Sequence, residues 1–212
     1  MVHLKISLHL KWQTAFHTTG NRWRWGADKA MVRRYDGAYV LPATSLKGAL
    51  RAQAERILGD KACKASNPKH MCSDPNHLCL ACEVFGNPRR VSPLRFYDVV
   101  LPKSELQIRA GVAISRRRRA AVPQRLYFVE TTAAGPMVAQ ADIQGLFPSQ
   151  EKAEEAAALV ILAAQMLSAL GAGRTRGLGW LETIEAECTI EGKPLDRRVL
   201  EHHWNQWLGG GQ

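Results

Sequence analysis

The first twelve residues constrain the fold most strongly. From Val2 to Trp12, apolar and polar side chains alternate without a break, which is the period of a β-strand with one face in the core and one outside. The outer face would carry two histidines and two lysines. Such a face suits a sheet that contacts RNA, and it is equally compatible with a plain solvated surface.

Two longer helical patterns accompany this strand. One helix is expected to begin at residues 42–45, with Thr44 or Ser45 as its cap, and to end at Gly59. Its apolar stripe would consist of Leu46, Leu50, Ala54 and Ile57. The second helix, residues 151–170, begins with acidic residues, continues almost entirely apolar and should be the central buried helix.

The remaining elements are shorter. Further strands are expected at residues 94–101, 126–132, 137–143 and 178–187, with extended pieces within 31–41 and a short amphipathic helix at 200–208. This order of strands and helices suits an α+β fold with a ferredoxin-like core of the RNA-recognition type. We expect one domain over residues 1–212, with a zinc-binding insertion at 60–90 and a protruding basic hairpin at 102–130.

The charge balance indicates a polyanionic partner. The 212 residues include 29 Lys and Arg against 19 Asp and Glu, a formal charge of +10, which favours nucleic acid over an acidic metabolite; a merely basic soluble protein is the simpler alternative. No signal-peptide pattern follows Met1, and the longest apolar run, Ala156–Ala164, is too short for a bilayer. We therefore expect a cytoplasmic protein without membrane contact, whose five cysteines are thiols or metal ligands.

Four closely spaced cysteines are the sharpest local signal: Cys63, Cys72, Cys79 and Cys82. The segment that carries them cannot build a core of its own, so a tetrahedral, structural Zn²⁺ bound by thiolates would hold it together. His70 or His77 could replace one of the first two cysteines, whose spacing is unusual. A redox pair formed by the last two cysteines is the alternative, although no βαβ context surrounds it.

Basic residues gather in several loops. The decapeptide 171–180 holds four glycines together with Arg174 and Arg176, and its N–H groups can form an anion-binding nest; a helix end followed by a tight turn is the simpler interpretation. Lys47 and Arg51, near the N-terminus of the first helix, suggest a second phosphate site. Four consecutive arginines, residues 116–119, indicate a projecting hairpin tip or a mobile loop, where they would be solvated or would contact phosphates.

The loop of residues 14–29 is rich in polar and aromatic side chains. Arg22 and Arg24 alternate with two tryptophans, a combination that offers phosphate attraction and base stacking together; either tryptophan could instead be a buried anchor. Asp28 is the only carboxylate of this loop. It therefore either neutralises an arginine or takes part in chemistry.

Several of these stretches together resemble the RAMP superfamily. Residues 41–51, LPATSLKGALR, resemble its P-G-S-S-L-K-G-x-[LM]-R segment, and residues 171–179 resemble its glycine-rich loop. Gly111–Ile114, with the basic residues and Leu-Tyr-Phe that follow, resembles its hairpin region. Residues 17–20, HTTG, partly match its H-x-G-G, and residues 26–33 resemble its G-x-I-D-x-P-V-x-R with one residue missing before the aspartate.

Within that superfamily, the chain is most similar to the repeating backbone subunit of type III CRISPR effectors, which coats guide RNA. The resemblance implies that the partners are crRNA, complementary target RNA and other effector subunits, including further copies of a backbone subunit. RNA contacts would come from His17, Arg22, Arg24, Ser45, Lys47, Arg51, Gly173, Arg174, Thr175 and Arg176. The hairpin around Arg116, Arg117, Arg118 and Arg119 would act as a thumb wedged between guide segments.

The resemblance also gives Asp28 a role. It corresponds to the aspartate that cleaving members require to cut target RNA opposite the guide, where it could position Mg²⁺ or orient the target's 2′-OH. Three interpretations stay open. The first is a backbone subunit that cuts target RNA, and the second is the same scaffold without catalysis, in which Asp28 pairs with Arg24 or Arg33. The third is a standalone endoribonuclease that processes precursor RNA with His9 or His17 as general base. A zinc-dependent DNA-binding regulator is disfavoured because no recognition helix accompanies the cysteines.

Overall fold

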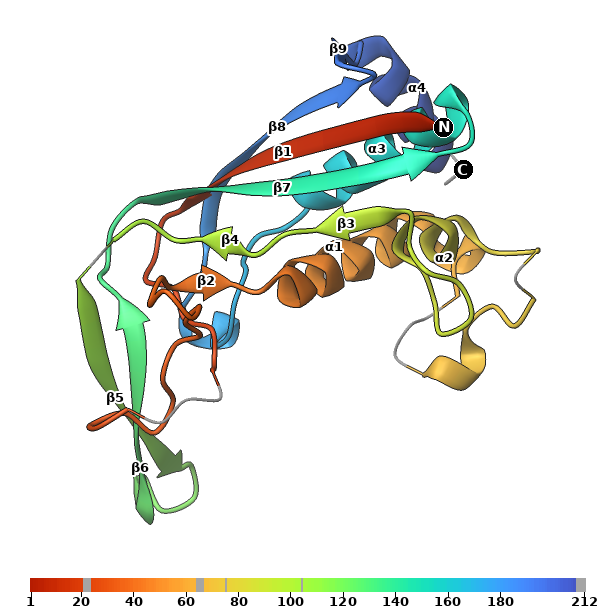
Figure 1. The fold of residues 1–212 in the computed structure, drawn as a ribbon. Coiled ribbons are helices and arrows are strands. Elements are labelled where there is room, and N and C mark those ends of the chain that lie inside the picture. The colour runs from red at the N-terminus through yellow and green to blue at the C-terminus, as the bar shows by residue number, and fades with distance from the viewer. Residues whose placement is uncertain (21–23, 64–66, 75, 104, 209–212) are drawn as a thin grey trace.

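The computed structural model describes residues 1–20, 24–63, 67–74, 76–103 and 105–208. Its main sheet is antiparallel, with the strand order β3-β7-β1-β8-β9 (Figure 1). The strands are β1 (Val2–Trp12), β3 (Leu94–Phe96), β7 (Met137–Phe147), β8 (Leu181–Ile190) and β9 (Lys193–Pro194). The expected N-terminal strand is confirmed over its whole length, and it forms the centre of the sheet between β7 and β8.

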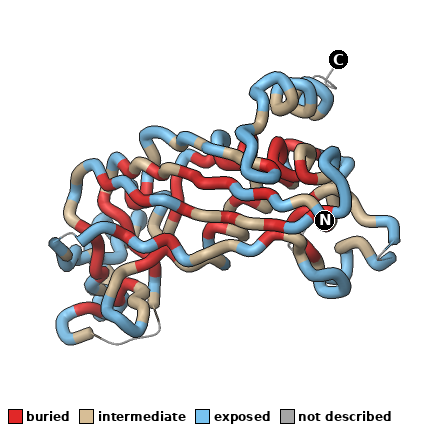
Figure 2. The backbone as a smooth tube through the Cα atoms, turned by 45° about the horizontal axis from the view of Figure 1, so that its top comes forward, coloured by how far each residue is buried: buried red, intermediate tan, exposed pale blue. Residues whose placement is uncertain are grey.

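Helices cover one face of this sheet. They are α1 (Ala43–Leu58) and α3 (Gln150–Gln165), with α4 (Arg197–Leu208) packed against α3. The inward side chains of β1, from Leu4 to Trp12, are fully buried, and buried and exposed residues alternate along the strands (Figure 2). The chain is thus a mixed α+β protein whose core lies between the sheet and its helical layer. None of the helices in the described part of the chain is long and apolar enough to cross a membrane.

The open face of the sheet has mixed charge. Lys11 Nζ lies 2.9 Å from Glu182 Oε1, and His9 Nε2 lies 3.7 Å from Glu187 Oε1. Both carboxylates belong to β8, the neighbour of β1. Because they offset the cations of β1, this surface favours the solvated alternative over a sheet that faces RNA.

The first helix begins differently from the prediction. Its apolar stripe is buried as expected, and Gly59 follows its last residue. The predicted cap by Thr44 or Ser45 is wrong: Pro42 occupies the N-cap position, and the N–H of Ala43, the first helical residue, donates to Asp98 Oδ1 over 2.8 Å. Proline has the backbone angles this position needs, so the chain turns into the helix before either hydroxyl residue.

The central helix is shorter than predicted. It was expected to reach residue 170, but α3 ends at Gln165. Residues beyond it pair with the start of β8 instead: Leu181 N donates to Ser168 O over 2.9 Å, and Ala169 forms a β-bridge with Trp180. Backbone pairing with distant residues has therefore overridden the helix propensity of this segment.

Two segments project from this body (Figure 1). The strands β5 (Leu106–Ser115) and β6 (Ala120–Thr132) form an antiparallel hairpin with the four arginines at its turn. At the other end of the molecule, the insertion between α1 and β3 holds η1 (Gly59–Lys61), η2 (Pro68–His70) and α2 (Leu80–Phe85). A small pairing of β2 (Val40–Leu41) with β4 (Val99–Val100) lies between them.

Candidate functional site

The glycine loop, residues 171–179, is docked on the segment that follows β1. Ala172 N donates to His17 O over 2.8 Å, and Gly179 N donates to Ala15 O over 2.8 Å. Gly171 has φ +98°, and a Cβ there would lie 2.6 Å from His17 O; at Gly179, with φ +72°, it would lie 1.9 Å from Leu170 O. The glycines are therefore needed for close backbone packing, and Gly171 is not a helix cap, because α3 ends earlier.

A groove of about 440 Å³ lies between this loop and one face of α1. The helix contributes Ser45, Gly48, Ala52 and Arg56, which share one face because they repeat at intervals of three and four residues. The loop contributes Arg174. Two arginines and no carboxylate occur among the described residues that line the groove, so it attracts anions.

Gly48 is unusual within this groove. Glycine in a helix interior costs about 0.5–1 kcal/mol relative to alanine, and a Cβ at Gly48 would meet nothing within 4 Å. No contact within the described chain therefore requires a glycine at this position. An approach of a ligand to the backbone would require it.

The two other basic residues expected at this helix do not line the groove. Lys47 Nζ lies 5.7 Å from the centre of the Phe96 ring, and burial together with the nearby Arg51 charge lowers the pKa of Lys47. Arg51 faces the insertion, where its Nη1 donates to Gly86 O over 2.5 Å. The structure thus brings Ser45 and Arg174 together and points Lys47 and Arg51 to a different side of the helix.

A second, smaller cavity of about 190 Å³ lies between the glycine loop and the base of the hairpin. It is lined by Lys29, Arg109 and Arg176, with Tyr127 on one wall. The Arg176 guanidinium lies 5.4 Å above the Tyr127 ring, a cation–π contact. That ring lies across Gly111 on the partner strand, where a Cβ would be only 2.3 Å from it.

His17 lies in the wall of this cavity and is almost fully buried. Its Nδ1 is 2.7 Å from Glu130 O, and its Nε2 is 3.0 Å from Thr19 Oγ1. Because a carbonyl only accepts, Nδ1 carries the proton and Nε2 accepts from the threonine. Burial, followed by the charge of Lys29, lowers the pKa of His17, so this histidine is neutral near pH 7.

A buried carboxylate that the sequence analysis missed anchors the loop before α1. Glu130, fully buried in β6, forms ion pairs with Arg24 and with Arg33, whose Nη2 lies 3.4 Å away. It also accepts hydrogen bonds from Met31 N over 3.0 Å and from the Tyr39 hydroxyl over 3.3 Å. The only available signal was a lone acid inside an otherwise uncharged strand segment, YFVETT.

Asp28 is exposed at the edge of this loop. Its Oδ2 accepts a hydrogen bond from Phe128 N over 2.7 Å, and its own N–H donates to Phe128 O over 2.9 Å. Within the described residues, Arg24 and Arg33 pair with Glu130, not with Asp28. The carboxylate is therefore held by the backbone of the hairpin at an exposed position.

The remaining predicted residues are more dispersed. Arg116, Arg117, Arg118 and Arg119 are exposed at the hairpin turn. Gly173 lines the smaller cavity, and Thr175 is exposed on the same loop between the two arginines. Arg22 lies outside the described residues.

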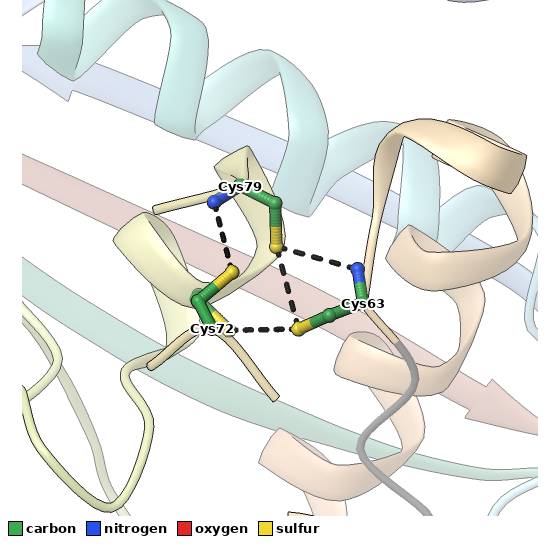
Figure 3. Close-up of side chains that lie close together, drawn as sticks. Cys63, Cys72 and Cys79 are labelled. Atoms are coloured by element: carbon green, nitrogen blue, oxygen red, sulfur yellow. Dashed lines mark hydrogen bonds between the residues drawn. The ribbon is translucent and has the colours of Figure 1, made fainter. Parts of the chain in front are cut away.

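The four cysteines of the insertion come together in space. The sulfurs of Cys63, Cys72, Cys79 and Cys82 all lie within 4.8 Å of one another. Figure 3 shows how Cys63, Cys72 and Cys79 converge. A tetrahedral zinc at about 2.3 Å from each sulfur needs sulfur separations near 3.8 Å, so this arrangement can hold a metal ion. Neither His70 nor His77 belongs to the cluster within the described chain; His77 Nδ1 instead lies 2.7 Å from Asp74 Oδ2.

The surroundings shift the thiols of the cluster in opposite directions: burial raises the pKa of Cys63, whereas the pKa of Cys79 is lowered. Burial acts to raise the pKa of Cys79, but hydrogen bonds from the backbone N–H groups of Cys63 and Cys82 bring it down to about 7. Arg51 Nη2 lies 3.4 Å from Cys82 Sγ, while its Nε donates to Glu55 Oε1 over 2.8 Å. A cation is thus held against one sulfur of a cluster that would carry negative charge.

Comparison with known proteins identifies the family of the chain. A search among curated proteins returned no match for the chain. A sequence model of the RAMP superfamily matches residues 10–182, a span that runs from β1 to the start of β8 and includes the groove, the hairpin and the cysteine cluster. The chain therefore belongs to the RAMP superfamily, whose members are RNA-binding proteins associated with CRISPR.

Proposed function

We propose that this chain is a guide-RNA-binding backbone subunit of a cytoplasmic CRISPR ribonucleoprotein effector, similar to the repeating subunit of type III complexes. The groove between α1 and the glycine loop carries this proposal. Its described lining has two arginines and no carboxylate, and its small residues let the backbone of a ligand approach closely. A ribose-phosphate chain is the ligand that such a surface fits, because its charge is negative and its recognition needs no particular base.

The topology supports the same assignment. The order β1-α1-β3-β7-α3-β8 along the chain, with β3-β7-β1-β8 across the sheet, supports a ferredoxin-like core. The open sheet face is partly neutralised by β8. We therefore assign RNA binding to the helix and loop edge and not to the sheet face.

The cysteine cluster would hold a structural zinc. Four thiolates close a tetrahedral shell and leave no position for substrate. Zinc would cross-link the parts of the insertion around η1 and η2, in which no described residue is buried, to α2, which packs into the core through Ala81, Val84 and Phe85. Arg51, fixed by Glu55 and Gly86, would balance part of the cluster's negative charge.

Target cleavage is assigned to Asp28. Its exposed carboxylate is not neutralised by Arg24 or Arg33, which contact Glu130, so it can position Mg²⁺ or orient a 2′-OH. The standalone processing enzyme receives less support, because both ring nitrogens of His17 are engaged within the chain and His9 lies near a carboxylate on the sheet face.

The groove assignment is tested by RNA binding. In Arg56→Gln/Arg174→Gln, affinity for single-stranded RNA should fall, and the slope of log K against log salt should decrease by about 0.7 for each phosphate contact removed. Arg198→Gln removes one exposed charge of the same kind on α4 and should leave both quantities nearly unchanged. Equal affinity and slope in the double variant and the parent would refute the groove.

The cleavage assignment has a separate test. Asp28→Asn keeps an oxygen for Phe128 N–H, so the loop should stay in position while the charge is lost. In the assembled complex, target cutting should cease while target binding persists; Asp60→Asn, at an exposed position of η1, is the control. Undiminished cutting by Asp28→Asn would leave only the scaffold function.

A further inference from the structure

The smaller cavity is lined by three cations that have no counterion in the described part of the chain. Lys29, Arg109 and Arg176 come from the N-terminal loop, β5 and the glycine loop. No described carboxylate lines the cavity, and none of the three cations takes part in the ion pairs of the described chain. Like charges held around one small space repel each other. An anion between them would convert this repulsion into attraction.

A second feature of the wall points to a ligand. Thr131 lines the cavity and is fully buried, and its Oγ1 has no hydrogen-bond partner in the described structure. Buried hydroxyl groups without a partner are uncommon in folded proteins because they lose their hydration without compensation. A ligand oxygen would provide the missing partner once the Thr131 side chain rotates toward the cavity, because its Oγ1 has no accessible surface in this structure.

The size of the cavity limits what can enter. At about 190 Å³, it has the room of about six water molecules of ~30 Å³ each. A phosphate group and the atoms next to it fit this volume. The ligand would therefore be a phosphate whose parent molecule continues outside the cavity, with the Tyr127 ring beside it.

We propose that this cavity is a phosphate-binding subsite for the RNA strand paired with the guide, separate from the groove that holds the guide. This inference rests on the proposed function. The glycine loop stands between the two sites, since Ala172 contributes to the lining of both. Arg174 faces the groove and Arg176 faces the cavity, so neighbouring loop residues serve different strands.

The position of Asp28 decides which strand the cavity receives. Asp28 directly precedes Lys29, and it is bonded to Phe128, which lies between Tyr127 and Val129 of the cavity wall. A phosphate held by Lys29 and Arg176 would thus lie on the strand nearest the carboxylate assigned to cutting. That strand is the target, because the guide is not cut.

The test uses guide-loaded complexes that carry Lys29→Gln, Arg109→Gln or Arg176→Gln. Affinity for complementary RNA should fall about tenfold in each variant, the loss expected for one charge-assisted hydrogen bond, and the salt dependence should weaken. Guide occupancy should remain that of the parent. Arg198→Gln, with the same change of charge on α4, should bind target normally.

Two results would overturn the proposal. Unchanged target affinity in all three variants would show that the cavity does not contact the strand, whereas equal loss of guide would make it part of the guide site. Free phosphate is the other possible ligand, and inorganic phosphate is the probe for it. If inorganic phosphate raises the melting temperature of the parent but not of Arg176→Gln, and target affinity is unaltered, the cavity binds free phosphate and the proposal fails. Failure of Arg56→Gln/Arg174→Gln to weaken guide binding would instead count against the proposed function itself.

Discussion

Replacing Glu130 by glutamine should destabilise the protein more than any other single loss of charge discussed above. The side chain is fully buried, and it is bonded to Met31 N–H while Arg24 and Arg33 neutralise its charge. Glu130→Gln keeps the shape and an oxygen for the Met31 N–H. It removes the negative charge and leaves two guanidinium groups facing a neutral amide.

The size of the expected stability loss depends on how exposed the two arginine partners of Glu130 are. Breaking a fully buried ion pair costs about 3–5 kcal/mol, but the arginine side chains are 39% and 34% exposed, so solvent recovers part of their hydration. We expect a loss of about 2–3 kcal/mol in the free energy of unfolding. For a chain of this length, that loss corresponds to a melting temperature lower by about 4–12 °C.

Urea unfolding at pH 7.5 measures this loss, provided that the m-value is unchanged. The control is Glu201→Gln, which removes an exposed helical pair with Arg197 and should cost at most about 0.5 kcal/mol. In the assembled complex, Glu130→Gln should also slow target cutting, because it loosens the loop that carries Asp28. A loss below about 1 kcal/mol would refute the reasoning that Glu130 anchors this loop.

Two further predictions concern α1. Arg51→Gln should lower the zinc affinity of the cysteine cluster by about 10–100-fold, because the Arg51 guanidinium contacts Cys82 Sγ. Competition with a chelator measures this affinity, and Arg198→Gln is the control. An unchanged zinc affinity would show that Arg51 does not support the metal site. Gly48→Ala should stabilise the helix by about 0.5–1 kcal/mol, since the added methyl group meets no atom within 4 Å, and should weaken RNA binding several-fold by projecting into the groove. Thermal unfolding and RNA titration would check both effects, and undiminished RNA binding would contradict a close approach of the ligand at this helix.

Local patterns were sufficient for much of the fold. The period of β1, the apolar stripe of α1 and the pairing of the hairpin around the arginines were all predictable, because each depends on residues close together in the chain. The boundary of α3 was not predictable. Its last predicted turn is lost to pairing with residues 180–181, and such a competition between local and distant partners leaves no local signal.

The sequence predicted which kinds of groups form the candidate site, but not which residues belong to it. A basic glycine loop, an arginine-rich hairpin and four closely spaced cysteines are visible in the sequence, because residue type alone restricts their chemistry. The groove side of α1 could have been suggested by Gly48 in a helix interior. The direction in which Lys47 and Arg51 point depends on what packs against each side of the helix.

The sequence by itself determined an amphipathic sheet, its two long helices, a basic surface and a cysteine-rich insertion, because periodicity, charge and ligand type are properties of neighbouring residues. Only the tertiary structure decided that Arg174 and Arg176 face separate sites, that Arg51 serves the cysteines, and that Glu130 neutralises arginines about a hundred positions away. The physical reason is that charge pairing and cavity shape depend on distances in space, and these are set by the packing of the hairpin, the glycine loop and the insertion against one core.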